Sequence, residues 1–441
     1  FDEKHQFSSS KQFTELYKKY RTLFNQKTKK EYFAECFKEF GVLTWSYLLN
    51  KYKPKPSNSS ILLGNAANYF LDEVLVNNEV PFPYLMKQFF KMYPLECTLL
   101  KDSEVVDLNT KAKMHFTNLK RVVNEEFKSI GIEEDGIYLE PTFISAQYGL
   151  QGRLDLFYDQ ITKQHAHIVE LKSSKPYKTN AYGINANNYI QTLLYDLLIR
   201  SVFKSKKKLS SYILYSQLDN KALRYAPPIK AQQIEALAVR NELVLMELRL
   251  TKNELLDEML AQLHPGILPL QQGFIANDLQ DFQQFYSSLK PVEKAYLIEY
   301  TGFIAREHHL AKVGEHSDEF NNGMAALWLN NRLEKEENFN ILSQLVFSEE
   351  KGSSEDHLLV FTRTSESNEL ANFRQGDIGV LYPHSISGVS PLEHQIFKCN
   401  IIDIKETSIT LRLRNKQRKN SVFKQWPQWN LEHDLIDSSF Q

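Results

Sequence analysis

The segment from residue 152 to residue 172 constrains the fold of this chain more than any other. It reads GRLDLFYD, then a short polar turn, then HAHIVELK. Apolar and polar residues alternate with period two in both parts, which predicts two β-strands. We expect Leu154 and Leu156 to face one side and Asp155 the other, whereas Glu170 and Lys172 share a face. Two carboxylates and an ammonium group beside apolar strands need a compensating partner, and a divalent metal ion is the natural one.

Two predicted helices carry further polar residues. The segment NNYIQTLLYDLLIR, beyond the second strand, places Asn188, Gln191 and Tyr195 on one helical face and leucines on the other. Upstream, LLGNAANYFLDEVL predicts another helix, which carries Gly64 and Asn68. The order along the chain is therefore Gly-x-x-x-Asn, Asp, Glu-x-Lys and Gln-x-x-x-Tyr.

This order resembles the PD-(D/E)XK nuclease superfamily and, within it, the RecB-like branch, whose hallmarks are GxxxH, D, ExK and QxxxY. Asn68 stands where the first motif of that branch has histidine, and Asn188 where a histidine often precedes the glutamine. The resemblance implies an α/β (α+β) fold with a restriction-endonuclease-like core, large helical additions and phosphodiester hydrolysis as the activity.

Longer segments narrow the resemblance. EPTFISAQYGLQGRLD (140–155) resembles the Okazaki-flap nuclease-helicase family, in which a glutamate strand leads into GLxGxxD. Residues 303–314, 323–328 and 373–382 resemble the region that joins nuclease to helicase there, and 429–440 the lead-in to the helicase motor. The chain has no GxxxxGK[ST] phosphate loop. The resemblance therefore implies a nuclease part cut before its motor, with the C-terminal helicase domain of the longer protein as a partner.

The chemistry implied is metal-dependent hydrolysis. A bound Mg²⁺ or Mn²⁺ neutralises charge on the attacking and leaving oxygens and activates water. Because hard cations take oxygen ligands, we expect Asp155, Glu170 and the backbone carbonyl of Leu171 to hold the ion. Asn68 offers an amide oxygen in place of the family's histidine, or acts through a water.

The remaining motif residues have positioning roles in this interpretation. Lys172 orients the attacking water or stabilises the phosphorane-like oxygens. Gln191 and Tyr195 position Lys172, water or the DNA phosphate. Glu140 and Asn188 are expected to support the site. Each residue taken singly is more often a surface, capping or core residue, but the ordered set on strand, strand and helix favours an active site.

Charge gives no global attraction to nucleic acid, since the formal net charge of the 441 residues is −1. Affinity must then come from local patches, and the basic runs lie at 18–30, 204–208 and 412–426. The residues predicted to bind DNA are Arg153, Lys204, Lys206, Lys207 and Lys208. No apolar run approaches the length of a membrane span, so no membrane partner is expected.

Cysteine usage favours a reducing compartment. Cys36, Cys97 and Cys399 are odd in number and far apart, which argues against a disulfide framework. We therefore expect a cytoplasmic or nucleoid-associated bacterial protein. Many relatives in this nuclease branch carry an iron–sulfur cluster on four cysteines, three of them after the last motif. Only Cys399 follows Tyr195 here, so no iron–sulfur cluster is expected.

The hydrophobic pattern divides the chain into four regions. The core strands are expected near 137–147, 150–158, 165–173 and 211–216, with a helix over 187–202. The regions are a helical N-terminal part with the first motif (1–135), the nuclease core (136–220), a helical connecting region (221–350), and a small β-barrel with the lead-in to the missing motor (351–441).

Two functions remain open. The first is a metal-dependent nuclease acting on single-stranded or flap DNA in replication or repair, with the DNA passing between the core and the 228–348 helical region. The second is a catalytically impaired nuclease fold that binds nucleic acid, in which replacement of the first-motif histidine by Asn68 removed activity. The retained charges at Asp155, Glu170 and Lys172 favour the first.

Overall fold

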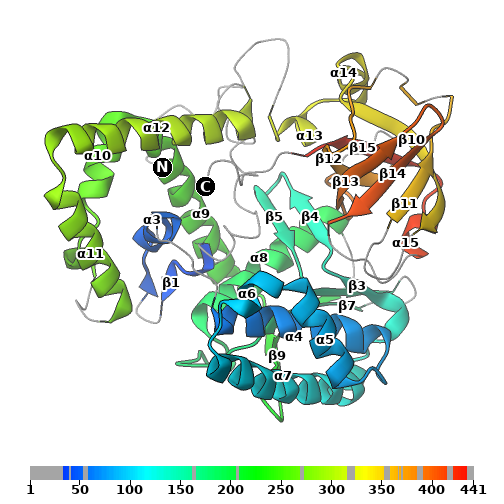
Figure 1. Ribbon diagram of the computed structural model, residues 1–441, viewed down its shortest axis with the longest axis horizontal. Helices are drawn as coiled ribbons and strands as arrows, with labels where there is room; N and C mark the ends of the chain where they lie inside the picture. Colours follow the sequence, from blue (N-terminus) through cyan, green and yellow to red (C-terminus); the bar gives the residue numbers. More distant parts are fainter. Residues whose placement is uncertain are drawn as a thin grey trace.

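The computed structural model shows a mixed helix and strand protein with a sheet layer, a helical arm and a closed barrel (Figure 1). Sequence and structure agree on the α+β class and on a small barrel near the C-terminus. The described residues are 33–38, 41–52, 58–160, 165–204, 208–268, 273–314, 323–351, 358–365, 367–368, 371–384, 391–414 and 421–434.

A five-stranded sheet forms the centre of the predicted core. Its strands, in spatial order, are β3 (Ile137–Leu139), β6 (Leu156–Asp159), β7 (His165–Lys172), β8 (Lys208–Tyr215) and β9 (Leu223–Ala226). Strands β7 and β8 pair in parallel, and the other neighbours are antiparallel. A parallel pair needs a crossover connection, and helix α8 (Ala186–Phe203) supplies it.

Helices cover both faces of this sheet. Alternate strand residues such as Phe157 and Ile168 pack in one cluster with the leucines of α8. Their neighbours, Val169 among them, pack in a second cluster with α4 (Ser59–Val76) and α7 (Asp102–Val122). Helices α5 (Phe82–Met92) and α6 (Pro94–Thr98) lie beside α4 and α7 (Figure 1). The two-faced burial follows from the period-two pattern of the strands.

The chain breaks between the two halves of the segment expected as a single strand at 150–158. Strand β5 (Leu150–Arg153) pairs with β4 (Thr142–Ser145) in a separate two-stranded sheet, and β6 begins only at residue 156. Leu154 therefore packs in the α8 cluster and Leu156 in the α4 cluster. The expectation that both leucines share one face was wrong, because the strand alternation is interrupted at Asp155.

A helical arm follows the sheet. It consists of α9 (Lys230–Leu250), α10 (Asn253–Ala261), α11 (Phe274–Ser288) and α12 (Pro291–Val313). Helix α9 packs on α8, which leaves α8 buried on nearly all sides instead of on one face. Near the start of the described chain, β1 (Phe37–Lys38), β2 (Gly41–Val42) and α3 (Trp45–Tyr52) precede α4, and Lys51 in α3 forms an ion pair with Glu247 in α9.

The barrel closes from six strands. In spatial order they are β10 (Ile341–Lys351), β11 (Leu358–Thr362), β14 (Ser408–Leu413), β13 (Phe397–Ile404), β12 (Ile378–Pro383) and β15 (Trp429–His433). Its core holds the fully buried Trp429 beside Phe361 and Phe423. The first strand begins at Ile341, ahead of the boundary at 351 expected from the sequence. Short helices α13 (Ala326–Leu329), α14 (Arg332–Glu337) and α15 (Ser421–Lys424) flank the barrel.

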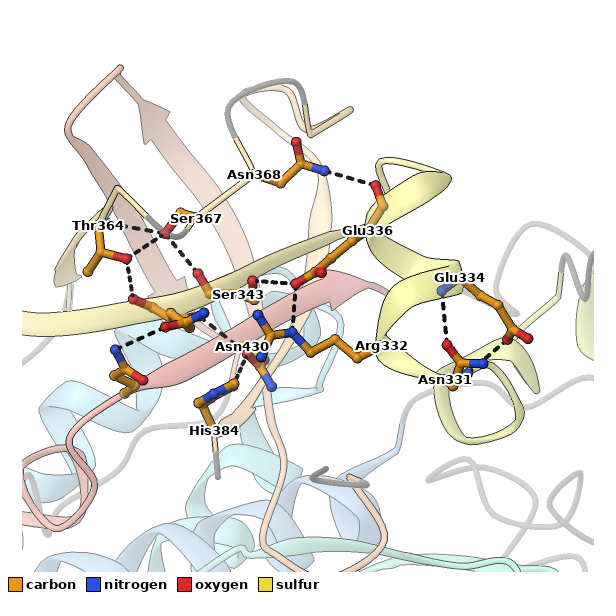
Figure 2. A network of polar contacts seen from close by, with 12 residues as sticks. Asn331, Arg332, Glu334, Glu336, Ser343, Thr364, Ser367, Asn368, His384 and Asn430 are labelled. Carbon is orange, nitrogen blue, oxygen red and sulfur yellow. Dashed lines mark hydrogen bonds and ion pairs between the residues drawn. The ribbon is translucent and has the colours of Figure 1, made fainter. Parts of the chain in front are cut away.

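Polar contacts fasten α14 to the barrel, as Figure 2 shows. The Glu336 carboxylate accepts hydrogen bonds from Arg332, at 2.7 Å, and from the hydroxyl of Ser343 in β10, at 3.0 Å. On the same helix, the buried Lys335 ammonium donates to Glu432 of β15 at 2.8 Å. The Tyr382 hydroxyl donates to the same carboxylate oxygen. These contacts connect α14 to barrel strands β10 and β15, the second of which lies about 97 residues further along the chain.

No helix within the described ranges is both long enough and apolar enough to cross a membrane.

Candidate active site

Asp155 occupies the break between β5 and β6, where the two sheets meet. Strand β6 pairs with β7 so that Leu156 lies opposite Val169, and continuing this register by one residue places Asp155 opposite Glu170. Directly opposed residues of an antiparallel pair project to the same face. The carboxylate is fixed there, since its Oδ2 accepts a hydrogen bond of 2.7 Å from the backbone N–H of Leu171.

Glu170 lies at the centre of the polar cluster. It is 2% exposed, although it sits on a strand whose other residues are mostly apolar. Its Oε1 accepts a hydrogen bond from the Lys172 ammonium at 2.9 Å and a second from the Gln191 amide at 2.7 Å. Burial of a carboxylate is costly without such partners. The structure thus brings together Asp155, Glu170, Lys172 and Gln191, which the sequence predicted as one site.

The donor set is compatible with a hard divalent cation. Among the described residues, no group of three or more His, Cys, Asp or Glu side chains is placed to hold a metal. The carboxylates that could hold an ion at this position are those of Asp155 and Glu170, and carbonyl, amide or water oxygens would have to complete its shell. Mg²⁺ fits this pattern, because it commonly binds through one or two carboxylates and keeps several waters. The all-oxygen set does not resemble a zinc site.

Helix α4 reaches the end of β7 through Gly64. A Cβ atom added to this glycine would lie 3.4 Å from the hydroxyl of Ser173, the residue after Lys172. Asn68 is one turn further along the same side of α4 and is half-buried. The first motif therefore comes to the same end of the central strand β7 as the Glu-x-Lys motif.

Tyr195 supports the strand that leads to Asp155. Its hydroxyl donates to the backbone carbonyl of Arg153 at 2.8 Å. The close approach requires a residue without a side chain at position 152, because a Cβ on Gly152 would lie 2.8 Å from the Tyr195 ring. Arg153 ends β5 two residues before Asp155, so the contacts of Tyr195 fix the backbone that carries the aspartate.

The expected supporting residues also have structural partners. The Glu140 carboxylate forms an ion pair with Arg153 at 3.0 Å, and the backbone N–H of Glu140 donates to the carbonyl of Asp155 at 3.1 Å. Arg153, predicted to contact DNA, is largely buried in this pair. Asn188 is buried and donates to the hydroxyl of Tyr215 in β8 at 3.2 Å. These residues contact the backbone and side chains that surround the site.

A buried polar relay behind Lys172 was not predicted from the sequence. The backbone carbonyl of Lys172 accepts hydrogen bonds from Ser216 through its N–H at 3.0 Å and its hydroxyl at 3.3 Å. That hydroxyl lies 2.9 Å from Nδ1 of His115 in α7. Burial lowers the pKa of His115 from 6.5 to about 4. Asn118, one turn along α7, donates to the Ser216 carbonyl at 3.0 Å. A lone histidine and asparagine in an amphipathic helix give no sequence signal for this role.

The lysine run at 204–208 lies partly outside the described residues, since Lys206 and Lys207 are not among them. Lys204 ends α8 in a left-handed conformation and forms an exposed ion pair with Glu393 at 3.1 Å. Lys208 opens strand β8 and is exposed. An exposed ion pair of this kind is weak and exchangeable, so Lys204 is accessible to a polyanion.

No model of a known protein family matches this chain, and no curated protein matches it either.

Proposed function

We propose that the chain is a metal-dependent nuclease that hydrolyses phosphodiesters of single-stranded or flap DNA. The observation that carries the proposal is the convergence on Glu170, whose Oε1 receives both Lys172 and Gln191. A merely structural Glu–Lys pair needs no third partner from a helix and no second carboxylate opposite. The four residues come from three separate elements, which a surface ion pair does not require.

Each residue then has a defined task. The divalent ion, when bound, supplies Lewis-acid stabilisation of the oxygens on phosphorus and a water of lowered pKa. Asp155 and Glu170 provide its carboxylate ligands. Lys172, held at the edge of the site by Glu170, places positive charge where the phosphorane-like oxygens develop. Gln191 fixes the rotamer of Glu170, because its amide donates to the oxygen that also faces Lys172.

The fold around these residues supports the same proposal. A mixed sheet with α8 on one face and α4 on the other, and acidic residues at one end of its central strand β7, is the arrangement expected of a restriction-endonuclease-like core. The barrel and the helical arm have counterparts, by the sequence resemblance above, in nuclease-helicases of replication and repair. We therefore place the chain as the nuclease part of such a protein, with a helicase motor as its covalent partner.

A second candidate function is nucleic-acid binding without cleavage. Asn68 favours it, since an amide oxygen is a weaker ligand than a histidine nitrogen and no third acidic residue replaces it within the described chain. A cleavage assay distinguishes the two functions.

The test uses circular and linear single-stranded DNA with Mg²⁺, with Mn²⁺ and with a chelator. Cleavage should require the metal and should be abolished in Lys172→Ala, while the mutant keeps the fold and the DNA affinity. Lys128→Ala, an exposed lysine on another face, is the matched control. Metal-dependent binding with no cleavage of any substrate by the wild type would select the second function. Wild-type turnover in Lys172→Ala would assign Lys172 to a structural ion pair.

A further inference from the structure

The connection between Lys172 and helix α8 is an ordered loop, residues 173–185, here called the β7–α8 loop. Two asparagines organise it. The Asn180 side chain accepts hydrogen bonds from the N–H groups of Tyr182 and Ile184, at 2.9 and 3.1 Å. The Asn185 side chain accepts from the N–H of Tyr177 at 2.7 Å. The loop is therefore held in one shape without a hydrophobic core of its own.

This fixed loop presents an aromatic side chain to solvent. Tyr177 is 66% exposed, although burial of a tyrosine ring usually stabilises a protein. Tyr182, by contrast, rests against Tyr189 of α8 with ring centroids 5.8 Å apart. The backbone beside Tyr177 is also unusual, since Lys178 has a φ of +46°, a conformation that costs a non-glycine residue free energy. The backbone strain at Lys178 and the exposed ring of Tyr177 both raise the free energy of the folded loop.

The charge of the loop has one sign. Its sequence, SSKPYKTNAYGIN, contains two lysines and no acidic residue. Lys175 and Lys178 are exposed, and the Lys178 ammonium lies 5.3 Å from the centroid of the Tyr177 ring. Across the loop, the guanidinium of Arg224 in β9 lies against Gly183, whose added Cβ would be 3.4 Å from it. The loop that follows Lys172 therefore carries an exposed aromatic ring with an ammonium group beside it and a second exposed lysine two residues earlier.

We propose that the β7–α8 loop binds single-stranded DNA, with one base stacked on Tyr177 and the adjacent phosphates beside Lys175 and Lys178. The inference rests on the proposed function for the position of the scissile phosphate, but it makes a separate claim about binding. Aromatic rings and lysines are the elements with which proteins hold single strands without reading sequence. A base paired inside a duplex offers no free face to Tyr177, so the loop selects unpaired DNA.

The test measures binding without cleavage, in chelator, with a fluorescent oligothymidylate. Tyr177→Ala should raise the Kd about 5- to 100-fold, the range expected for loss of one base–aromatic stack. Tyr177→Phe should stay near wild type, because it keeps the ring. Tyr84→Ala is the matched control, since Tyr84 is also an exposed tyrosine but lies on α5, outside the loop.

Two further arms separate the possible results. Lys175→Gln should reduce the slope of log Kd against log salt by about 0.7, the value for one phosphate contact on a single strand. A blunt duplex should compete poorly with wild type and with Tyr177→Phe. Equal Kd values for Tyr177→Ala and Tyr84→Ala would overturn the inference, as would an unchanged salt slope. If the wild type binds DNA through Tyr177 but cleaves no substrate, the inference about the loop holds and the nuclease function is rejected.

Discussion

Nδ1 of His115 lies 2.9 Å from the hydroxyl of Ser216, and this contact ties helix α7 to the end of strand β7. The Ser216 hydroxyl has one proton, which it gives to the carbonyl of Lys172. The Ser216 hydroxyl therefore bridges Nδ1 of His115 and the backbone carbonyl of Lys172. These contacts run from α7 through Ser216 to the backbone carbonyl of Lys172.

The first prediction tests His115 as a positioning residue. His115→Asn keeps a polar group near the Nδ1 position, whereas His115→Gln places its amide near Nε2, where no described residue forms a hydrogen bond. We expect His115→Gln to lower kcat by about 10- to 100-fold with little change in KM, because a small displacement of a catalytic group has this effect. His115→Asn should recover most of the rate. Equal kcat values for the two variants, both folded, would limit His115 to packing.

The second prediction concerns the pH dependence of stability. The pKa of His115 is lowered from 6.5 to about 4 by burial, so the unfolded chain binds more protons than the folded one between these values. The free energy of unfolding should therefore be largest above pH 6.5 and should fall as the pH is lowered toward 4, by up to about 3 kcal/mol from this residue. Urea unfolding at several pH values measures it. His115→Asn should show a shallower fall, and a parallel curve would contradict the assignment.

The third prediction concerns the glycine next to Tyr195. In Gly152→Ala the new methyl group would lie 2.8 Å from the Tyr195 ring and 2.9 Å from Leu198, both of them buried. Overpacking of this kind costs about 1–3 kcal/mol of unfolding free energy. Gly64→Ala is the control, because its methyl group would make an ordinary contact with Ser173 and would favour the helix by about 0.5–1 kcal/mol. Similar losses in both variants would show that the packing at Gly152 is not tight.

Local patterns in the sequence predicted the central elements well. The strand at 165–173 and the helix at 187–202 appear as β7 and α8, because alternation and helical spacing are local properties. The Glu-x-Lys spacing placed Glu170 and Lys172 on one face for the same reason. The motif order placed Gln191 in the same site as a positioning group for Lys172, water or the DNA phosphate, but its hydrogen bond to Glu170 was not predicted.

Features set by distant parts of the chain could not be read in the same way. The break at Asp155 arises because β5 pairs with β4 while β6 pairs with β3 and β7, and alternation carries no information about strand partners. Tyr195 was expected to position Lys172, water or the DNA phosphate, and nothing in the sequence indicated that its hydroxyl donates to the Arg153 carbonyl. His115 and Ser216 are 101 residues apart, so their contact leaves no local pattern.

The fourth prediction concerns the attachment of α14 to the barrel. Lys335 and Glu432 form a buried ion pair, and the Glu432 carboxylate also accepts a hydrogen bond from the Tyr382 hydroxyl. Burial raises the pKa of Glu432, and the nearby Lys335 opposes this rise. Lys335→Met leaves a buried carboxylate uncompensated and should cost about 3–5 kcal/mol of unfolding free energy. The double variant K335M/E432Q removes the charge and should regain most of the loss. Additive losses in a double-mutant cycle would show that the two residues do not interact.

The last prediction concerns metal binding by the two carboxylates. A ligand that binds the folded state stabilises it by about 2.7 kcal/mol at 100 times its Kd, so Mn²⁺ should raise the Tm of the wild type. Glu170→Gln keeps the size of the side chain but removes a charged ligand, and should abolish most of the rise, as should Asp155→Asn. Glu140→Gln is the matched control, because Glu140 is a neighbouring carboxylate whose partner is Arg153. It should keep the full Mn²⁺ effect. If Glu170→Gln keeps it too, Glu170 serves only as the acceptor for Lys172 and Gln191, and the metal-dependent mechanism loses its principal ligand.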